Sequence, residues 1–117
     1  MAAGVAHVVL FRPCAALTLD ERTALVASFT RALREIPEIR RTRVGKRVTH
    51  GRPYELLMRE NYEYAVVLEF DDVRALEAYL QHPAHEELGQ RFLASFEAAL
   101  MYDYELSEGE AGLAALL

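Results

Sequence analysis

A phenol and two imidazoles lie close together in the short stretch from Tyr79 to His85. Tyr79 ends one run of apolar residues at helical spacing, and His82 and His85 flank Pro83 at the start of the next. In the first turn of a helix the partial positive charge favours the neutral, basic form of an imidazole such as His85. A neutral imidazole beside a phenol can take and return a proton near pH 7. These residues indicate a candidate acid/base site, and a purely structural helix corner is the alternative explanation of the same residues.

Capping residues and apolar spacing predict the two helices that form this corner. Asp72 is a suitable N-cap for a helix that ends at Leu80. Pro83 cannot continue that helix but fits the first turn of a second one, which is expected to run to about Glu97. The tight connection between the helices brings the side chains of Tyr79 and His85 together.

A third helix is predicted near the start of the chain. Thr18 and Glu21 form a capping box, and Pro37 stops the helix just after Ile36. We expect this helix to bury an apolar stripe consisting of Leu25, Phe29, Leu33 and Ile36.

Alternating apolar residues predict strands at 5–11, 41–49, 62–70 and 100–105. The resulting order is strand, helix, strand, strand, helices, strand. This order is the split βαβ pattern of an α+β, ferredoxin-like fold with an antiparallel sheet and helices on one face.

The remaining segments are a long connection and a tail. Residues 50–61 are longer and more apolar than an ordinary hairpin loop, which is consistent with a lid over a pocket or with a cover for the core. We assign residues 1–106 to one domain and 107–117 to a C-terminal tail that is flexible or lies on a partner.

The strands at 5–11 and 62–70 are apolar on both faces, although a chain of 117 residues has helices for only one face. An antiparallel sheet with one face in water should instead alternate between apolar and polar residues. We therefore predict a homodimer that forms through the sheet face. Coverage of that face by the tail or by the 50–61 loop is the alternative.

Charge and composition argue against two classes of partner and indicate where the protein is found. The formal net charge of −5 argues against nucleic acid, and no apolar run is long enough to span a bilayer, so neither nucleic acid nor membrane is expected. Met1 to Gly4 lacks secretory-signal features and the single Cys14 cannot form an internal disulfide, so we expect a cytoplasmic protein. A basic run suggests a charged edge strand: Arg40, Arg41, Arg43, Lys46, Arg47 and Arg52.

Four segments of the chain together resemble the stress-responsive α/β-barrel (Dabb) family, over about residues 5–106. The resemblance is carried by the stretch from His7 to Phe11, by Val44-Gly45, by Phe70 and by the corner from Tyr79 to His85. It implies a dimeric α+β barrel.

A plant polyketide cyclase that is similar to this family's pattern performs an aldol cyclisation without a cofactor. Its catalytic tyrosine and histidine fall on Tyr79 and His85, and one pocket histidine falls on His7. A second pocket histidine falls on Tyr64, which is a departure from the pattern. The resemblance thus implies a cofactor-free acid/base catalyst of the cyclase or lyase type.

We also expect an apolar pocket with a few polar groups, which would suit a small hydrophobic or aromatic ligand. On the residues alone, His7 is also consistent with a core histidine bonded to a backbone carbonyl. The predicted substrate-binding residues are His7, Val9, Phe11, Tyr64, Val66 and His82.

Several other readings of the same residues remain open. His82, His85 and Glu86, with His7 or Glu69, are potential metal ligands, but their spacing matches one helical face poorly and we predict no metal site. The chain has no Gly-rich phosphate loop and no recognisable nucleophile motif, so no cofactor is expected. A non-catalytic stress-related dimer, a small-ligand binder and, by fold analogy, a cofactor-free monooxygenase are the alternatives.

Overall fold

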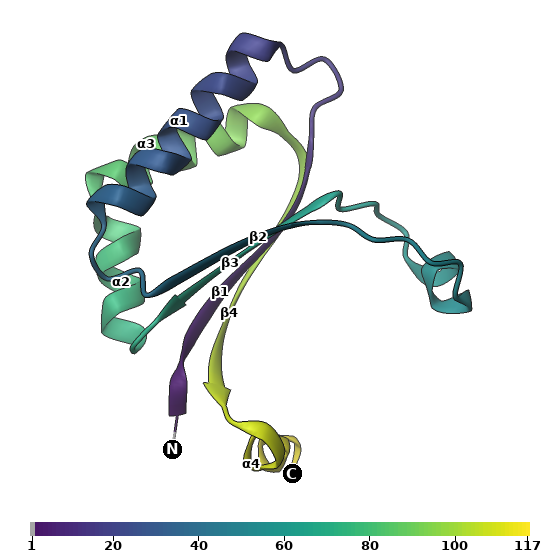
Figure 1. Ribbon diagram of the computed structural model, residues 1–117, viewed down its shortest axis with the longest axis vertical. Coiled ribbons are helices and arrows are strands. Elements are labelled where there is room, and N and C mark those ends of the chain that lie inside the picture. Colours follow the sequence, from purple (N-terminus) through teal and green to yellow (C-terminus); the bar gives the residue numbers. More distant parts are fainter. Residues whose placement is uncertain (1) are drawn as a thin grey trace.

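The computed structural model describes residues 2–117 and contains one four-stranded antiparallel sheet (Figure 1). The strand order across the sheet is β2-β3-β1-β4. The longer helices α1, α2 and α3 lie together on the same side of the sheet (Figure 1). This is the α+β, ferredoxin-like arrangement that the sequence predicts. The strands are β1 Ala2–Pro13, β2 Arg41–Lys46, β3 Tyr64–Phe70 and β4 Phe96–Ser107.

The helices begin and end close to the predicted capping residues. The Thr18–Glu21 capping box is present, and Asp72 accepts a hydrogen bond from the backbone N–H of Ala75 at 2.9 Å. None of the helices in the described chain combines the length and the apolar character needed to cross a bilayer. The helices are α1 Leu19–Glu35, α2 Val73–Gln81, α3 Pro83–Ser95 and the short α4 Gly109–Leu113, with 3-10 turns η1 Pro53–Leu57 and η2 Ala114–Leu116.

The two strands that cross the middle and one edge of the sheet are longer than predicted. β4 pairs with β1 from Ser107 opposite Ala2 to Phe96 opposite Pro13. α3 therefore ends at Ser95, slightly before the predicted Glu97. Backbone ladder bonds do not need apolar side chains, so the alternating pattern underestimates how far this pair of strands extends.

The strands β2 and β3 are shorter than predicted, because their ladder ends at the pair Lys46–Tyr64. Residues 47–63, which we call the arm, then leave the sheet and project away from the helices (Figure 1). β2 is an edge strand, as the basic run suggests. Only the first part of the predicted 41–49 strand is therefore a strand.

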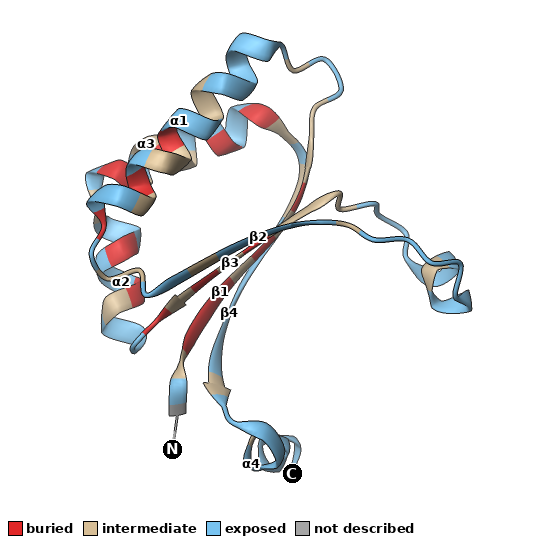
Figure 2. Ribbon diagram, viewed as in Figure 1, coloured by how far each residue is buried: buried red, intermediate tan, exposed pale blue. Residues whose placement is uncertain are grey.

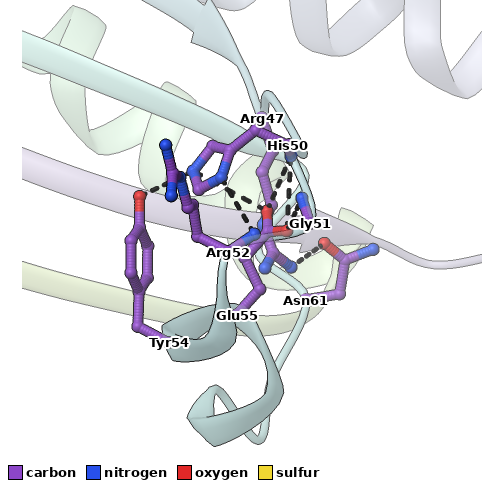
Figure 3. A network of polar contacts seen from close by, with 7 residues as sticks. All are labelled: Arg47, His50, Gly51, Arg52, Tyr54, Glu55 and Asn61. Atoms are coloured by element: carbon purple, nitrogen blue, oxygen red, sulfur yellow. Dashed lines mark hydrogen bonds and ion pairs between the residues drawn. The ribbon is translucent and has the colours of Figure 1, made fainter.

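The arm is ordered by its own polar contacts (Figure 3). The carboxylate of Glu55 accepts hydrogen bonds from the backbone N–H groups of Gly51 and His50, at 2.6 Å and 3.2 Å respectively. The Tyr54 hydroxyl lies 2.6 Å from Nε2 of His50. Gly51 has a φ of 77°, a conformation in which a residue without a Cβ avoids strain. The arm nevertheless exposes a set of apolar side chains: Val48, Tyr54, Leu56, Leu57 and Met58.

α1 packs mainly against its neighbour α3 rather than flat on the sheet. Ser28 and Ala32 are buried on α1, and both Ser28 and Arg31 contact the carboxylate of Glu87 on α3. Of the stripe that the sequence predicts to be buried, Ile36 is buried. The other three residues are partly buried and pack against the core, so the stripe faces inward as predicted but is less buried than expected: Leu25, Phe29 and Leu33.

The face of the sheet that points away from the helices carries apolar side chains that the single chain covers incompletely. Figure 2 shows that the second half of β4 is largely exposed. In the register of the sheet, Val8 of β1 lies between Val67 of β3 and Tyr102 of β4. Tyr102 and Tyr104 are 55% and 53% exposed. We call this surface the open face. Neither the arm nor the C-terminal segment buries it.

Gly4 gives a test of the strand geometry at the start of the central strand. Its φ is 105°, and a Cβ atom built on it would lie 2.6 Å from the carbonyl oxygen of Phe70. We expect Gly4→Ala to lower the free energy of unfolding by roughly 1–3 kcal/mol, because the new methyl group forces strain and displaces a backbone carbonyl. Urea unfolding at a fixed protein concentration measures this change.

Gly45→Ala in β2 is the matched control, since no atom lies within 4 Å of the position that the new methyl group would take and the φ of Gly45 is not positive. Equal stability of the two variants would show that the conformation at Gly4 is not as described.

Candidate active site

The candidate catalytic side chains meet on the helix-covered face of the sheet. His7 comes from the central strand β1, Tyr79 from the last turn of α2 and His85 from the first turn of α3. The ring of Tyr79 lies between the two imidazoles, with centroid distances of 5.7 Å to His7 and 4.6 Å to His85. Three titratable rings therefore form one cluster, which supports the predicted grouping of these residues.

The α2–α3 corner holds Tyr79 and His85 close together. α2 ends at Gln81, and His82 is at once its C-cap and the N-cap of α3. Nδ1 of His82 accepts a hydrogen bond from the backbone N–H of Ala84 at 3.0 Å, and Pro83 occupies the first turn. Because the corner is capped on both sides, the two rings have little freedom to separate.

The hydrogen bonding of His85 leaves one ring nitrogen available as a base. Nδ1 lies 3.1 Å from the backbone carbonyl oxygen of Leu80, and a carbonyl only accepts, so Nδ1 carries the proton. Burial lowers the pKa of His85 below its ordinary 6.5, against the effect of the Leu80 carbonyl, and nearby His7 lowers it further. At pH 7 His85 is therefore neutral, with the lone pair on Nε2. The sequence predicts this direction from the helix terminus, whereas burial is its main cause.

The phenol of Tyr79 remains protonated across the physiological pH range. Its side chain is 3% exposed and packs against Phe70 with a ring-centroid distance of 5.2 Å. Burial, together with the negative charge of Asp103, raises the pKa of Tyr79 to about 12. A protonated phenol beside a neutral imidazole can donate a hydrogen bond to an oxygen atom that gains negative charge.

Asp103 joins this cluster through the register of the sheet. It lies directly opposite His7 on the neighbouring strand β4, and opposed residues of an antiparallel pair point to the same face. Oδ1 of Asp103 is 2.5 Å from Nδ1 of His7. Because an ionised carboxylate only accepts, Nδ1 donates and the ring is held in one orientation. The structure thus pairs His7 with a carboxylate and not with the backbone carbonyl considered above.

A cavity of about 200 Å³ opens next to the three rings. Its polar groups come from His7, Tyr79 and His85, and the rest of its wall is apolar or glycine. Such a space, apolar with a few convergent polar groups, is typical of a small-ligand site. The apolar and glycine lining consists of Val9, Phe29, Val66, Leu68, Leu88, Gly89, Phe92, Leu93 and Met101.

The predicted substrate-binding residues divide between this cavity and its surroundings. His7, Val9 and Val66 line it together with the predicted catalytic pair. Phe11 and Tyr64 stack on each other, with ring centroids 5.6 Å apart, and line a second, larger cavity instead. Val66 borders both cavities. Tyr64, the departure from the family pattern, therefore lies away from the acid/base cluster.

His82 lines neither cavity, because its ring is turned back to cap α3. Its predicted role in binding substrate stays a prediction. The arm residues 50–61 also line neither cavity. Within residues 2–117 the structure brings together no group of three or more His, Cys, Asp and Glu side chains that could hold a metal ion.

Asp103 is the site residue that reasoning from the sequence missed. In the sequence it stands out only as one of several acidic residues near the C-terminus. The available signal was alternation, which puts Asp103 on the face opposite to Tyr102 and Tyr104. Recognising its partner required the β1–β4 register, which no local pattern supplies.

Comparisons with known proteins agree with this fold. The family model described as Stress responsive A/B Barrel Domain matches residues 5–106. Olivetolic acid cyclase from Cannabis sativa is 24% identical over 100 residues, which cover 86% of this chain and 94% of the cyclase.

Two solved structures resemble the chain in fold. A hydroxynitrile lyase from Passiflora edulis superposes with a TM-score of 0.75 at 18% identity, covering 90% of this chain and 94% of the lyase. A dimeric ferredoxin-like protein of unknown function from Thermobifida fusca superposes with a TM-score of 0.68 at 23% identity, covering 88% and 91% of the two chains.

The environment of His85 predicts a pH dependence of stability. The folded pKa lies below 6.5, so between 6.5 and that lower value the unfolded chain binds more protons than the folded one. The stability contributed by neutral, partly buried His85 is present above pH 6.5 and is lost as the pH falls through this window. We expect NMR titration of the imidazole protons to give a pKa below 6.5 for His85.

His85→Gln is the matching variant for the stability measurement, since the amide keeps a polar side chain but does not titrate. Urea unfolding at about pH 7.5 and about pH 5.5 should show a smaller loss of stability on acidification in His85→Gln than in the wild type. An equal loss in both proteins would contradict the burial of a neutral imidazole.

Proposed function

The chain belongs to the stress-responsive A/B barrel domain family, and we propose that it is a cofactor-free acid/base catalyst of the cyclase or lyase type. The observation that carries the proposal is the cluster of neutral His85 and protonated Tyr79 at an apolar cavity. Similarity to olivetolic acid cyclase and to a hydroxynitrile lyase supports the class of reaction. The substrate is a small apolar carbonyl compound.

In the proposed reaction Nε2 of His85 removes a proton from the carbon next to a carbonyl group. The electron pair of that C–H bond forms the enolate, whose oxygen accepts a hydrogen bond from the Tyr79 hydroxyl. The enolate carbon then bonds to a second carbonyl carbon, and protonated His85 returns its proton to the new alkoxide. The reverse sequence cleaves a carbon–carbon bond. Both directions balance without a metal or a redox cofactor.

The surroundings of the two groups fit these roles. Burial keeps His85 neutral and therefore ready to accept a proton, and it keeps Tyr79 protonated and therefore ready to donate a hydrogen bond. In an apolar cavity a hydrogen bond to a developing oxyanion is worth more than in water. His7, held by Asp103, would position a hydroxyl or carbonyl group of the substrate.

The size of the cavity limits the reacting part of the substrate. At about 200 Å³ it is smaller than the pockets of roughly 300–1,000 Å³ that hold drug-sized ligands. A single aromatic ring or a short alkyl chain beside the carbonyl group fits this limit. Binding of such a molecule without turnover is the second candidate function, since the same cavity favours it.

A homodimer through the open face is the assembly we propose. The open face presents Val8, Val67 and Tyr102 in one row across the sheet, and half-exposed tyrosines extend it along β4. An apolar sheet face of this kind is stable when a second sheet covers it. The described dimeric state of the Thermobifida fusca protein supports the same arrangement.

Hydrogen–deuterium exchange into a simple ketone tests the proton-abstraction step without knowledge of the natural substrate. Benzylacetone in D₂O should exchange its α-protons faster with the protein than in buffer, as followed by proton NMR. We expect His85→Ala to lower the protein-dependent rate by at least about 100-fold because the base is lost. Tyr79→Phe should lower it roughly 100-fold because the oxyanion donor is lost.

The control for general damage is His50→Ala, which removes an imidazole of the arm, far from the cavity lining. Circular dichroism confirms that each variant is folded. Wild-type protein that binds benzylacetone but accelerates no exchange would support the small-ligand binder instead. A rate unchanged by His85→Ala would remove His85 from the mechanism.

Sedimentation equilibrium tests the assembly. We expect a dimer at micromolar concentration in the wild type and a monomer in Val67→Asp, because a carboxylate on the open face cannot be buried against an apolar partner. Leu19→Asp, at an exposed position on α1, is the matched control and should stay dimeric.

A monomeric wild type, or a dimer that persists in Val67→Asp, would contradict the open-face assembly.

A further inference from the structure

A second cavity of about 520 Å³ lies between α1 and the sheet, next to the site described above. It is open to solvent between α1 and the edge strand β2. Phe29 and Val66 border both cavities, so they form the wall between them. The proposed reaction uses none of its other lining residues, which are Phe11, Pro13, Leu17, Arg22, Leu25, Val26, Thr30, Leu33, Val44, Tyr64 and Phe96.

The packing of α1 creates this space. Because α1 packs mainly against α3, part of its apolar stripe lines the space between this helix and the sheet. Leu25, Phe29 and Leu33 are therefore only partly buried. On either side of the opening, Val26 and Val44 are each 63% exposed. An apolar concavity of this size, lined by only a few polar groups, is typical of a ligand site.

The polar groups of the cavity indicate the charge of the ligand. Among the lining residues that the structure describes, Arg22 alone is charged. Its side chain is exposed, and no carboxylate within residues 2–117 lies within ion-pairing distance of it. A guanidinium at the end of an apolar space fits a carboxylate, because it donates two parallel hydrogen bonds to the two oxygens.

The geometry of α1 sets the length of the ligand. Arg22 and Phe29 are two helical turns apart, which corresponds to about 10.5 Å along the helix axis. A ligand whose carboxylate meets Arg22 can therefore extend a chain of this length along the stripe before it reaches Phe29. Tyr64, on the opposite wall, offers an aromatic surface to the same chain.

We propose that this cavity is a binding site for a medium-chain aliphatic carboxylate, with the chain along α1 and the carboxylate at Arg22. The chain replaces water on Leu25, Leu33 and Val44, and the ion pair with Arg22 distinguishes a carboxylate from a neutral molecule of the same length. This site stands apart from the acid/base cluster, and its occupation needs no turnover.

Isothermal titration calorimetry with decanoate and with decanol, both below their aggregation concentrations, tests the proposal on the full-length protein. Decanoate should bind more tightly than decanol to the wild type. Arg22→Gln should weaken decanoate binding by roughly fivefold, as expected for an exposed ion pair, and should leave decanol unchanged. Val44→Trp, which places a ring in the cavity from an exposed edge position, should abolish the binding of both ligands.

Arg34→Gln is the matched control, because Arg34 is an exposed arginine on the same helix that does not line the cavity. It should bind decanoate as the wild type does. Equal affinities for decanoate and decanol, or no binding of either, would overturn the proposal. So would decanoate binding that survives Val44→Trp or is unaffected by Arg22→Gln. Because only binding is measured, failure here leaves the proposed reaction untouched, and failure of the exchange experiment leaves this site untouched.

Discussion

The pairing of β1 on both of its edges is the constraint on which the rest of the structure depends. β1 is held between β3 and β4 by antiparallel ladders, and these fix which side chains share a face. One face of β1 carries His7 and Val9 toward the helices, and the other carries Val8 toward the open side. A shift of one residue in the β1–β4 ladder would turn Asp103 to the opposite face of the sheet and separate it from His7.

Helices on only one side of the sheet give its two faces different roles. The covered face forms the core and leaves space where the helices do not reach the strands. Because α1 packs mainly against α3, the larger cavity lies between α1 and the strands β2 and β3. The smaller cavity lies beside the α2–α3 corner. The open face keeps apolar side chains that the single chain does not bury. The two cavities and the open face thus have the same origin, which is a sheet with too few helices to cover it.

Burial shifts the pKa values of the titratable groups at the α2–α3 corner more than charged neighbours do. Desolvation lowers the pKa of His85 and raises that of Tyr79, so the base is neutral and the phenol is protonated in the same pH range. Asp103 adds a negative charge that is used to hold His7 and that further disfavours ionisation of Tyr79. Two groups whose ionisation is held apart by their surroundings form an acid/base pair.

The sequence by itself determined the three longer helices, the approximate places of the four strands and the α2–α3 corner, because those depend on neighbours in the chain. The capping box at Thr18, the N-cap at Asp72 and the helix start at Pro83 are local signals, and each lies where it was predicted. The grouping of Tyr79 with His85 follows from them. The prediction that the strands at 5–11 and 62–70 are apolar on both faces is likewise local, because alternate residues of a strand point to opposite faces.

Only the tertiary structure decided which distant residues meet. Asp103 and His7 are 96 positions apart in the chain and meet because of the register between β1 and β4, which is set by the whole sheet. Tyr64 falls into the larger cavity, and the stripe on α1 stays partly exposed, because α1 packs on α3. Local patterns fix what an element is and which face is apolar, whereas packing between elements fixes what that face touches.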